Sequence, residues 1–225
     1  MSFESINEWQ LQEVLTDRWL PTGIEHQGES LFLLAWEVMF DTWTINDNTK
    51  DWTKPSIDFI ALDESGTLVC IELKRRIAGR KSVWSALAQV TRRALLMSAS
   101  YTPEKLRRAH DLCGSGEHGR TASASPGSLE EVIENHFGTK VMLPASPNPP
   151  IRRVLAMTGH GPSLPGIVLS FNTAPLDETL AQLMDLYSTN SDHGGREIRR
   201  LAELVASDVD LGVVAAPVEL LILTE

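Results

Sequence analysis

The chain has 225 residues, 42% of them hydrophobic and 22% charged, which is the composition of a folded globular protein rather than a disordered one. Its length allows one sizeable core, and its net charge of −10 excludes a surface coated throughout in positive charge. The longest apolar run, Leu31–Phe40, is too short for a membrane span and contains Glu37, so no membrane partner is expected.

The N-terminal residues and the cysteines indicate a cytoplasmic protein. The stretch MSFESINEWQ is acidic and lacks the basic-then-apolar order of a secretion signal. Cys70 and Cys113 are too few for a disulfide framework, and Cys70 lies in an apolar run, where a buried free thiol is usual. We therefore expect a reducing, cytoplasmic setting.

The first 54 residues predict a helix, a strand and a long connection. Apolar residues recur at helical spacing over residues 5–16, and we expect that helix to end at Trp19–Pro21. The run Glu29–Phe40 fits a buried strand or a buried helix, and we favour a strand over Leu31–Val38. The polar stretch Thr44–Lys54 then connects it to the next element.

The following stretch, Pro55–Arg76, predicts a β-hairpin. Ser56–Leu62 and Leu68–Leu73 are rich in β-branched and aliphatic residues, and turn residues separate them. A three-residue loop over Glu64–Gly66 would place Gly66 in the left-handed conformation that closes such hairpins. Asp63 would then pair with Thr67.

This register brings three charged side chains together. Counting outward from the loop places Asp58 opposite Glu72. Because side chains alternate along a strand, Lys74 lies on the same face as Glu72, and Asp58 joins them there. Two acids and a lysine therefore meet at the open end of a mostly apolar hairpin.

The remainder of the chain predicts further helices and strands around one sheet. Ser82 is the expected N-cap of the helix after the hairpin, Thr102 caps the next one, and residues 113–127 form a flexible Gly/Ser-rich insertion. The predicted helices are Ser82–Ser98, Tyr101–Leu112, Ser128–His136, Leu176–Tyr187 and Glu197–Ala206, and the predicted strands are Ile151–Met157, Ile167–Phe171 and Val218–Leu223.

The order of these elements predicts an α/β protein with a central mixed sheet flanked by helices. We expect a single domain over residues 1–225, with its core at about 5–110 and further strands and helices at 151–225.

The hairpin residues suit a metal site for phosphate chemistry. Mg²⁺ prefers oxygen ligands, and here Asp58 and Glu72 supply carboxylates while the backbone carbonyl of Leu73 adds a third oxygen. Lys74 then holds or deprotonates the attacking water, or stabilises charge on the phosphorus centre. The alternative is a hairpin end whose charges form ordinary surface ion pairs.

These residues resemble the PD-(D/E)XK nuclease superfamily, with its restriction-endonuclease-like core. Asp58, thirteen intervening residues and then Glu72-Leu73-Lys74 match the metal-binding acids and the lysine, although Ile57 replaces the proline of the motif. The spacing is most similar to the catalytic domain of mismatch-specific endonucleases and related uncharacterised proteins. The resemblance covers about residues 5–98. We expect no separate N-terminal DNA-binding domain like that of the mismatch endonucleases, so mismatch specificity does not carry over.

The resemblance implies two further site positions. Such nucleases often carry a glutamate on the first core helix, where Glu8, with Glu13 second, is available. Many also carry Gln-x-x-x-Tyr on the helix after the lysine. Gln89 fits that motif, but Arg93 stands where the tyrosine would be.

Positive charge is concentrated beside the hairpin. Residues 74–108 carry a net +9, whereas the remainder of the chain carries −19. Such a segment either tracks nucleic-acid phosphates or is a solvated helical face. Its candidate nucleic-acid-binding residues are Arg75, Arg76, Arg80, Lys81, Arg92 and Arg93.

The sequence therefore predicts a DNA endonuclease-like hydrolase that uses Mg²⁺ or Mn²⁺, in repair or phage defence. A homodimer is one expected arrangement, since cutting both strands of a duplex requires two sites. The main alternative is an inactive nuclease fold that binds nucleic acid or a protein partner. A third is an interaction protein in which the charged hairpin end is only structural.

Overall fold

The computed structural model describes residues 3, 6–39, 42–44, 56–77, 79–114, 127–187, 193–207 and 209–224, without the side chains of residues 186, 193 and 194. The expected connection Thr44–Lys54 lies outside these residues except for Thr44, as does most of the expected insertion at 113–127. The helices of the described part are α1 (Glu8–Thr22), α2 (Arg80–Ser100), α3 (Pro103–Gly114), α4 (Leu129–Phe137), α5 (Leu164–Thr173), α6 (Leu176–Tyr187), α7 (His193–Ala206) and the short 3₁₀ helix η1 (Leu211–Val214).

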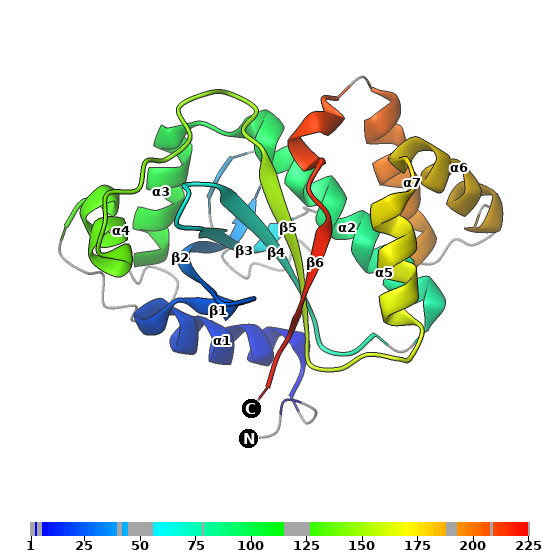
Figure 1. Ribbon diagram of the computed structural model, residues 1–225, viewed down its shortest axis with the longest axis horizontal. Coiled ribbons are helices and arrows are strands. Elements are labelled where there is room, and N and C mark those ends of the chain that lie inside the picture. Colours follow the sequence, from blue (N-terminus) through cyan, green and yellow to red (C-terminus); the bar gives the residue numbers. More distant parts are fainter. Residues whose placement is uncertain are drawn as a thin grey trace.

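Six strands of the described residues form one mixed sheet, in the spatial order β1 to β6 (Figure 1). The first four are antiparallel neighbours, whereas β5 pairs in parallel with both β4 and β6. The strands are β1 (Ile24–His26), β2 (Glu29–Met39), β3 (Ser56–Leu62), β4 (Leu68–Lys74), β5 (Ile151–Met157) and β6 (Val218–Ile222). The α/β class and the mixed, helix-flanked sheet predicted from the sequence are confirmed.

The hairpin β3–β4 lies at the centre of this sheet and has the predicted register. Gly66 has a φ of +83°, its N–H donates to the carbonyl of Asp63, and the N–H of Asp63 donates to the carbonyl of Thr67. Phe59 pairs with Ile71, so the same register continued by one residue places Asp58 opposite Glu72. Both strands are almost wholly buried, which explains their continuous apolar sequence.

Two helices cover the region of the hairpin. Helix α1 packs on β3 through an edge-to-face contact between Trp19 and Phe59, whose ring centroids are 5.0 Å apart. Helix α2 packs on β4 and β5, and its residues Thr91 and Arg93 reach side chains of the sheet. Side chains from both helices therefore meet the sheet where Asp58 and Glu72 lie.

Helices α5, α6 and α7 form a further group beyond α2 (Figure 1). The prediction of a strand over Ile167–Phe171 is wrong, because this segment belongs to α5. Its buried residues, Leu164, Ile167, Val168 and Phe171, follow helical spacing, while Leu169 and Ser170 are exposed. The helical spacing was hidden in the sequence because four of the five residues Ile167–Phe171 are apolar and only Ser170 is polar.

Three helix ends also differ from expectation. Helix α1 continues past Pro21 to Thr22 and ends at Gly23, whose N–H donates to the carbonyl of Trp19. The N-cap of α2 is Gly79 rather than Ser82, and α3 extends to Gly114, beyond the start of the predicted insertion. The predicted cap of α3 is confirmed, since Thr102 Oγ1 accepts from Lys105 N at 3.2 Å. No helix in the described part of the chain is long and apolar enough to cross a membrane.

Candidate metal and phosphate site

Asp58 and Glu72 meet around the guanidinium of Arg93. Arg93 Nη1 donates to Asp58 Oδ1 at 3.0 Å and also contacts Glu72 Oε2. The second carboxylate oxygen of Asp58 accepts from the backbone N–H of Leu73 at 2.8 Å, so this aspartate is fixed to the neighbouring strand. One cation from α2 thus joins acids from β3 and β4.

Lys74 lies beside this pair, as the strand alternation predicts. Its Nζ is 2.7 Å from Glu72 Oε1 and 3.2 Å from Glu8 Oε1. Glu72 is fully buried, whereas the Lys74 side chain is 22% exposed, so the lysine marks the side on which solvent reaches the cluster. The sequence prediction that Glu8 would join the three hairpin residues agrees with this contact.

Helix α1 is fastened to the site through two residues one turn apart. Gln12 Nε2 donates to the backbone carbonyl of Asp58 at 3.1 Å, and Glu8 lies four residues earlier on the same helix face. A capping box between Asn7 and Gln10 fixes the start of the helix, and Arg75 Nη1 donates to the carbonyl of Ile6 at 2.8 Å. Glu13, the second candidate, follows Gln12 on α1 and is half-buried.

Glu37 is a site residue that the sequence reasoning did not assign. Trp36 pairs with Phe59 and Val38 with Ile57, so Glu37 lies opposite Asp58 on β2. Its φ of +52° is unusual for a residue with a side chain, and Ser56 Oγ donates to its Oε2 at 3.1 Å. Burial, together with the negative charge of Asp58, raises the pKa of the Glu37 carboxyl. The sequence did contain a signal for this residue, because Glu37 is the one acid within the apolar run Leu31–Phe40.

Negative charge exceeds positive charge in this cluster. Both oxygens of Glu72 are buried and accept no hydrogen bond of good geometry from the described residues, so ion pairing alone compensates them. Within the described part of the chain, no three His, Cys, Asp or Glu side chains are grouped as a metal-binding set. The four carboxyl groups are Glu8, Glu37, Asp58 and Glu72, and the two cations are Lys74 and Arg93.

The residues predicted to bind nucleic acid fall into two groups. Arg75, Arg76 and Arg80 are exposed, and Lys81 is half-buried, with its Nζ 5.3 Å from the ring centroid of Tyr187. Arg92 and Arg93 are buried and paired inside the protein, Arg92 with Glu197 on α7. These two therefore do not contribute to an exposed basic surface, because successive residues of α2 point toward different internal acids.

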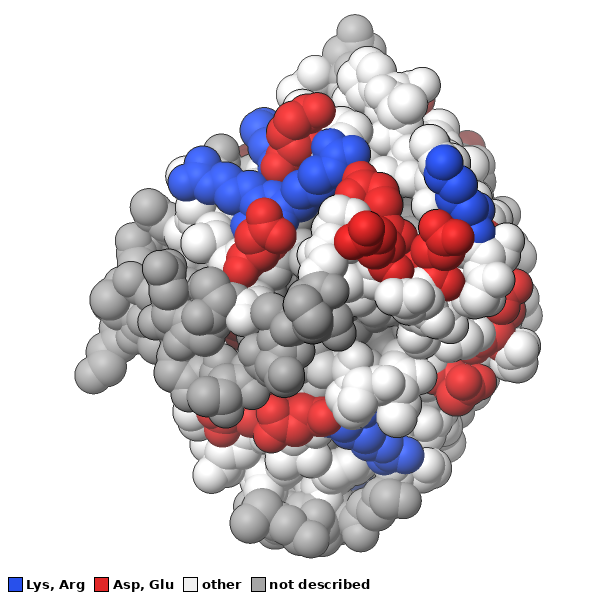
Figure 2. All heavy atoms as spheres, turned by 90° about the vertical axis from the view of Figure 1, so that its left-hand side faces the viewer, with Lys and Arg blue, Asp and Glu red and all other residues white. Residues whose placement is uncertain are grey.

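The rest of the basic segment is interleaved with acids. Figure 2 shows the side of the molecule on which α3 and α4 lie, where blue and red side chains adjoin one another. Arg107 of α3 illustrates this, since it is 2.7 Å from Glu130 on α4 and 3.9 Å from Glu104.

Gln89, the remaining predicted site residue, is buried on α2, one turn before Arg93.

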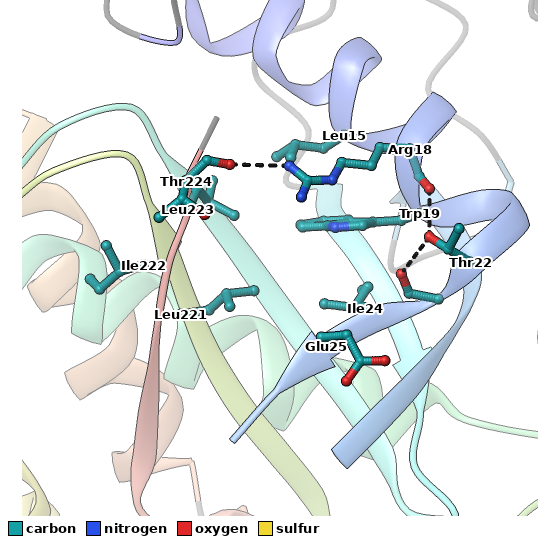
Figure 3. Close-up of a pocket in the computed structure, with 11 residues that line it drawn as sticks. Leu15, Arg18, Trp19, Thr22, Ile24, Glu25, Leu221, Ile222, Leu223 and Thr224 are labelled. Carbon is teal, nitrogen blue, oxygen red and sulfur yellow. Dashed lines mark hydrogen bonds between the residues drawn. The ribbon is translucent and has the colours of Figure 1, made fainter. Parts of the chain in front are cut away.

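A pocket of about 240 Å³ lies away from these acids, between α1 and the strands β1 and β6 (Figure 3). Leu15 and Trp19 line it from α1, and Leu221 and Leu223 line it from the opposite side. Arg18 Nη1 donates to the carbonyl of Thr224 at 3.1 Å across the pocket. None of the predicted site residues lines it.

No family model, curated protein or solved structure matches the chain.

Proposed function

We propose that the chain is a metal-dependent nuclease of the PD-(D/E)XK type, which hydrolyses phosphodiester bonds of nucleic acid. The observation that carries this proposal is the meeting of Asp58, Glu72 and Lys74 on adjacent strands, with Lys74 Nζ 2.7 Å from Glu72. The mixed sheet with helices on either side is compatible with a restriction-endonuclease-like core.

The residues fit a divalent cation. Buried Glu72 oxygens without hydrogen bonds, together with an excess of carboxyl groups over cations, favour an additional positive charge. Mg²⁺ or Mn²⁺ would be held by the carboxylates of Asp58 and Glu72 and by the backbone carbonyl of Leu73. When bound, such an ion lowers the pKa of water and offsets phosphate charge.

The side chains around the acids would prepare the attack on phosphorus. Lys74, drawn in by carboxylates on two sides, presents an ammonium at the solvent-reaching edge, where it orients the attacking water or stabilises developing negative charge. Glu8 positions that ammonium by accepting its hydrogen bond, and Gln12 holds Asp58 in place by donating to the backbone carbonyl of Asp58. Gln89 lies on the same face of α2 as Arg93 and would position the site from that side.

The exposed arginines at the end of β4 and the start of α2 support a nucleic-acid substrate. Arg75, Arg76 and Arg80 follow Lys74 closely in the chain and are exposed to solvent, from which phosphates would approach. Arg75 also donates to the carbonyl of Ile6. DNA is the proposed substrate, and a homodimer would supply two sites for duplex cleavage. The buried free thiols of Cys70 and Cys113 support a reducing, cytoplasmic location.

We expect Lys74→Ala to reduce cleavage at least about 100-fold, because the ammonium that orients water or stabilises negative charge is lost. Nicking of supercoiled plasmid in Mg²⁺ or Mn²⁺ measures this effect. Lys140→Ala removes an exposed lysine far along the chain and serves as the charge-matched control. Equal nicking by the Lys74 variant and the wild-type chain would remove Lys74 from the mechanism.

One observation favours a second function, a nuclease fold that binds nucleic acid without cutting it. Arg93 already supplies a cation to both Asp58 and Glu72, as a resident substitute for a metal would. Binding of a fluorescent DNA duplex in EDTA and in Mg²⁺ separates the two functions. DNA affinity that is insensitive to Mg²⁺, together with no plasmid nicking, would favour the non-catalytic module.

A further inference from the structure

The side chain of Arg93 is held at the meeting point of the two proposed metal-binding carboxylates. A single nitrogen, Nη1, contacts oxygens of both Asp58 and Glu72. The Arg93 side chain is buried, and its Nε–H donates no hydrogen bond to the described residues. The guanidinium is thus fixed by the two acids at one end, while another of its donors is unsatisfied.

Burial explains why a cation is needed there. Two carboxylates taken out of water repel one another, and a buried acid without a counter-charge destabilises the folded state. Arg93 compensates both acids, and Lys74 reaches only Glu72 and Glu8. Arg92, the preceding residue, pairs with Glu197 on another helix and supplies nothing to this site.

The same oxygens cannot serve Arg93 and a metal ion together. Asp58 Oδ2 already accepts from the N–H of Leu73, and Oδ1 is bound by the same Arg93 nitrogen that contacts Glu72. A divalent ion between the two carboxylates would therefore take the position of Nη1, and its charge would repel the guanidinium.

We infer that Arg93 is a built-in competitor of the metal, whose guanidinium must leave Asp58 and Glu72 before a divalent ion binds. This inference rests on the proposed function and adds a regulatory step to it. We call this arrangement the Arg93 gate, and it is closed when the guanidinium contacts both Asp58 and Glu72. In the closed state the arginine neutralises the two acids, and the site is inert. The apparent metal affinity is the intrinsic affinity multiplied by the fraction of molecules in which Arg93 has left the acids.

Titration calorimetry with Mn²⁺ alone tests the competition in the full chain. Arg93→Met keeps the apolar stem and removes the guanidinium, so we expect Mn²⁺ to bind about tenfold more tightly than to the wild-type chain. Arg107→Met makes the same charge change on α3, away from the acids, and is expected to leave the affinity unchanged.

The possible results separate the gate from the metal site. Equal or weaker Mn²⁺ binding by Arg93→Met, with measurable binding by the wild-type chain, would overturn the gate and leave the proposed metal site standing. An absence of Mn²⁺ binding in both folded proteins would overturn the gate and the metal-dependent function together.

A second measurement needs no variant and so does not depend on the folding of Arg93→Met. The Nε–Hε signal of Arg93, assigned through its backbone, is followed by NMR while Mg²⁺ is added to the wild-type chain. Displacement of the guanidinium predicts a shift of this signal that saturates with Mg²⁺, while the signal of Arg107 stays in place. A stationary Arg93 signal at saturating Mg²⁺ would contradict the inference.

Discussion

At the scale of single residues, Glu37 carries two costs that a structural role does not require. Its backbone adopts the left-handed region, which costs a residue with a side chain roughly 1–2 kcal/mol. The residue is also half-buried opposite Asp58, and both the loss of water around its carboxyl group and the charge of Asp58 raise its pKa. A strained backbone and a carboxyl group with a raised pKa are both typical of functional sites, which supports the inclusion of Glu37 in the acidic cluster.

We expect Glu37→Gln to be more stable than the wild-type chain at neutral pH in EDTA, by on the order of 1 kcal/mol. The pKa of Glu37 is raised in the folded state above its ordinary value of 4.5. Its protonated form therefore stabilises the fold below that pH, and this contribution is lost as the pH rises through the folded pKa. Urea unfolding from pH 4 to pH 8 measures the difference, which should grow with pH.

Glu64→Gln provides the matched control, because Glu64 is exposed in the turn of the central hairpin. Its stability should follow that of the wild-type chain at each pH. If Glu37→Gln also follows the wild-type curve, repulsion between Glu37 and Asp58 is not a cost to the folded state.

At the scale of elements, the central hairpin was predictable because several local rules agree. Turn residues, alternating faces and a single glycine specified one register, and the three charged residues followed from it. Glu37 was not assigned because the bulge near Leu34 and the left-handed backbone are set by tertiary packing. The same holds for Arg93, which was predicted to be in a nucleic-acid-binding surface because residues 74–108 are strongly basic, although its partners lie on two strands.

Segment Ile167–Phe171 shows a different limit of sequence reasoning. Five apolar or small residues in succession fit a strand as well as a buried helix turn, and only packing against neighbouring helices decides. The predicted register brings Asp58, Glu72 and Lys74 close together, as the structure shows. That these residues form a metal site of the nuclease type is a proposal.

We expect Gly66→Ala to destabilise the protein by roughly 2–4 kcal/mol, through its left-handed backbone and a steric clash together. A methyl group at this position would meet the backbone carbonyl of Met142, which cannot move as a flexible side chain would. Thermal unfolding measures the loss.

Gly28→Ala isolates the conformational part of that loss. Gly28 has the same φ of +83° in the turn between β1 and β2, but no atom lies within 4 Å of an added methyl group. We expect it to cost roughly 1 kcal/mol. Equal losses of stability for the two variants would show that the loop containing Met142 moves away from the added methyl group at no cost in the free energy of unfolding.

At the scale of the whole molecule, Arg152 joins distant parts of the sheet. Its guanidinium, on β5, donates to Glu29 on β2 at 2.8 Å, to Asp63 at 2.8 Å and to Glu219 on β6 at 2.9 Å. His26 on β1 is also 2.9 Å from Glu219, so side chains of the first and last strands meet. These hydrogen bonds and ion pairs connect the two edge strands of the sheet, β1 and β6, to one another.

The network predicts a loss of stability in acid. Burial raises the pKa of Glu219, but hydrogen bonds from His26 and Arg152 outweigh it and lower the pKa from 4.5 to about 2. The resulting stabilisation is present above pH 4.5 and is lost as the pH falls toward 2. Between these values we expect urea unfolding to show a loss of roughly 3 kcal/mol in the wild-type chain that Glu219→Gln does not show.

An exposed acid gives the reference for this measurement. Glu178→Gln on α6 should lose stability in acid as the wild-type chain does. Identical acid profiles for the Glu219 variant and the wild-type chain would assign the acid sensitivity to other carboxyl groups.

The parallel pairing of β4 with β5 has a consequence for the order of folding. Strand β3 reaches β4 through a short loop, whereas β5 follows β4 only after residues 75–150. Local hairpins close within microseconds, and distant parallel pairing is slow. Asp58 and Glu72 would therefore come together while still hydrated, and Glu72 would lose its water only when α2 and β5 dock. The two acids would thus meet early in folding, and Arg93 would reach them only in the later step in which α2 docks.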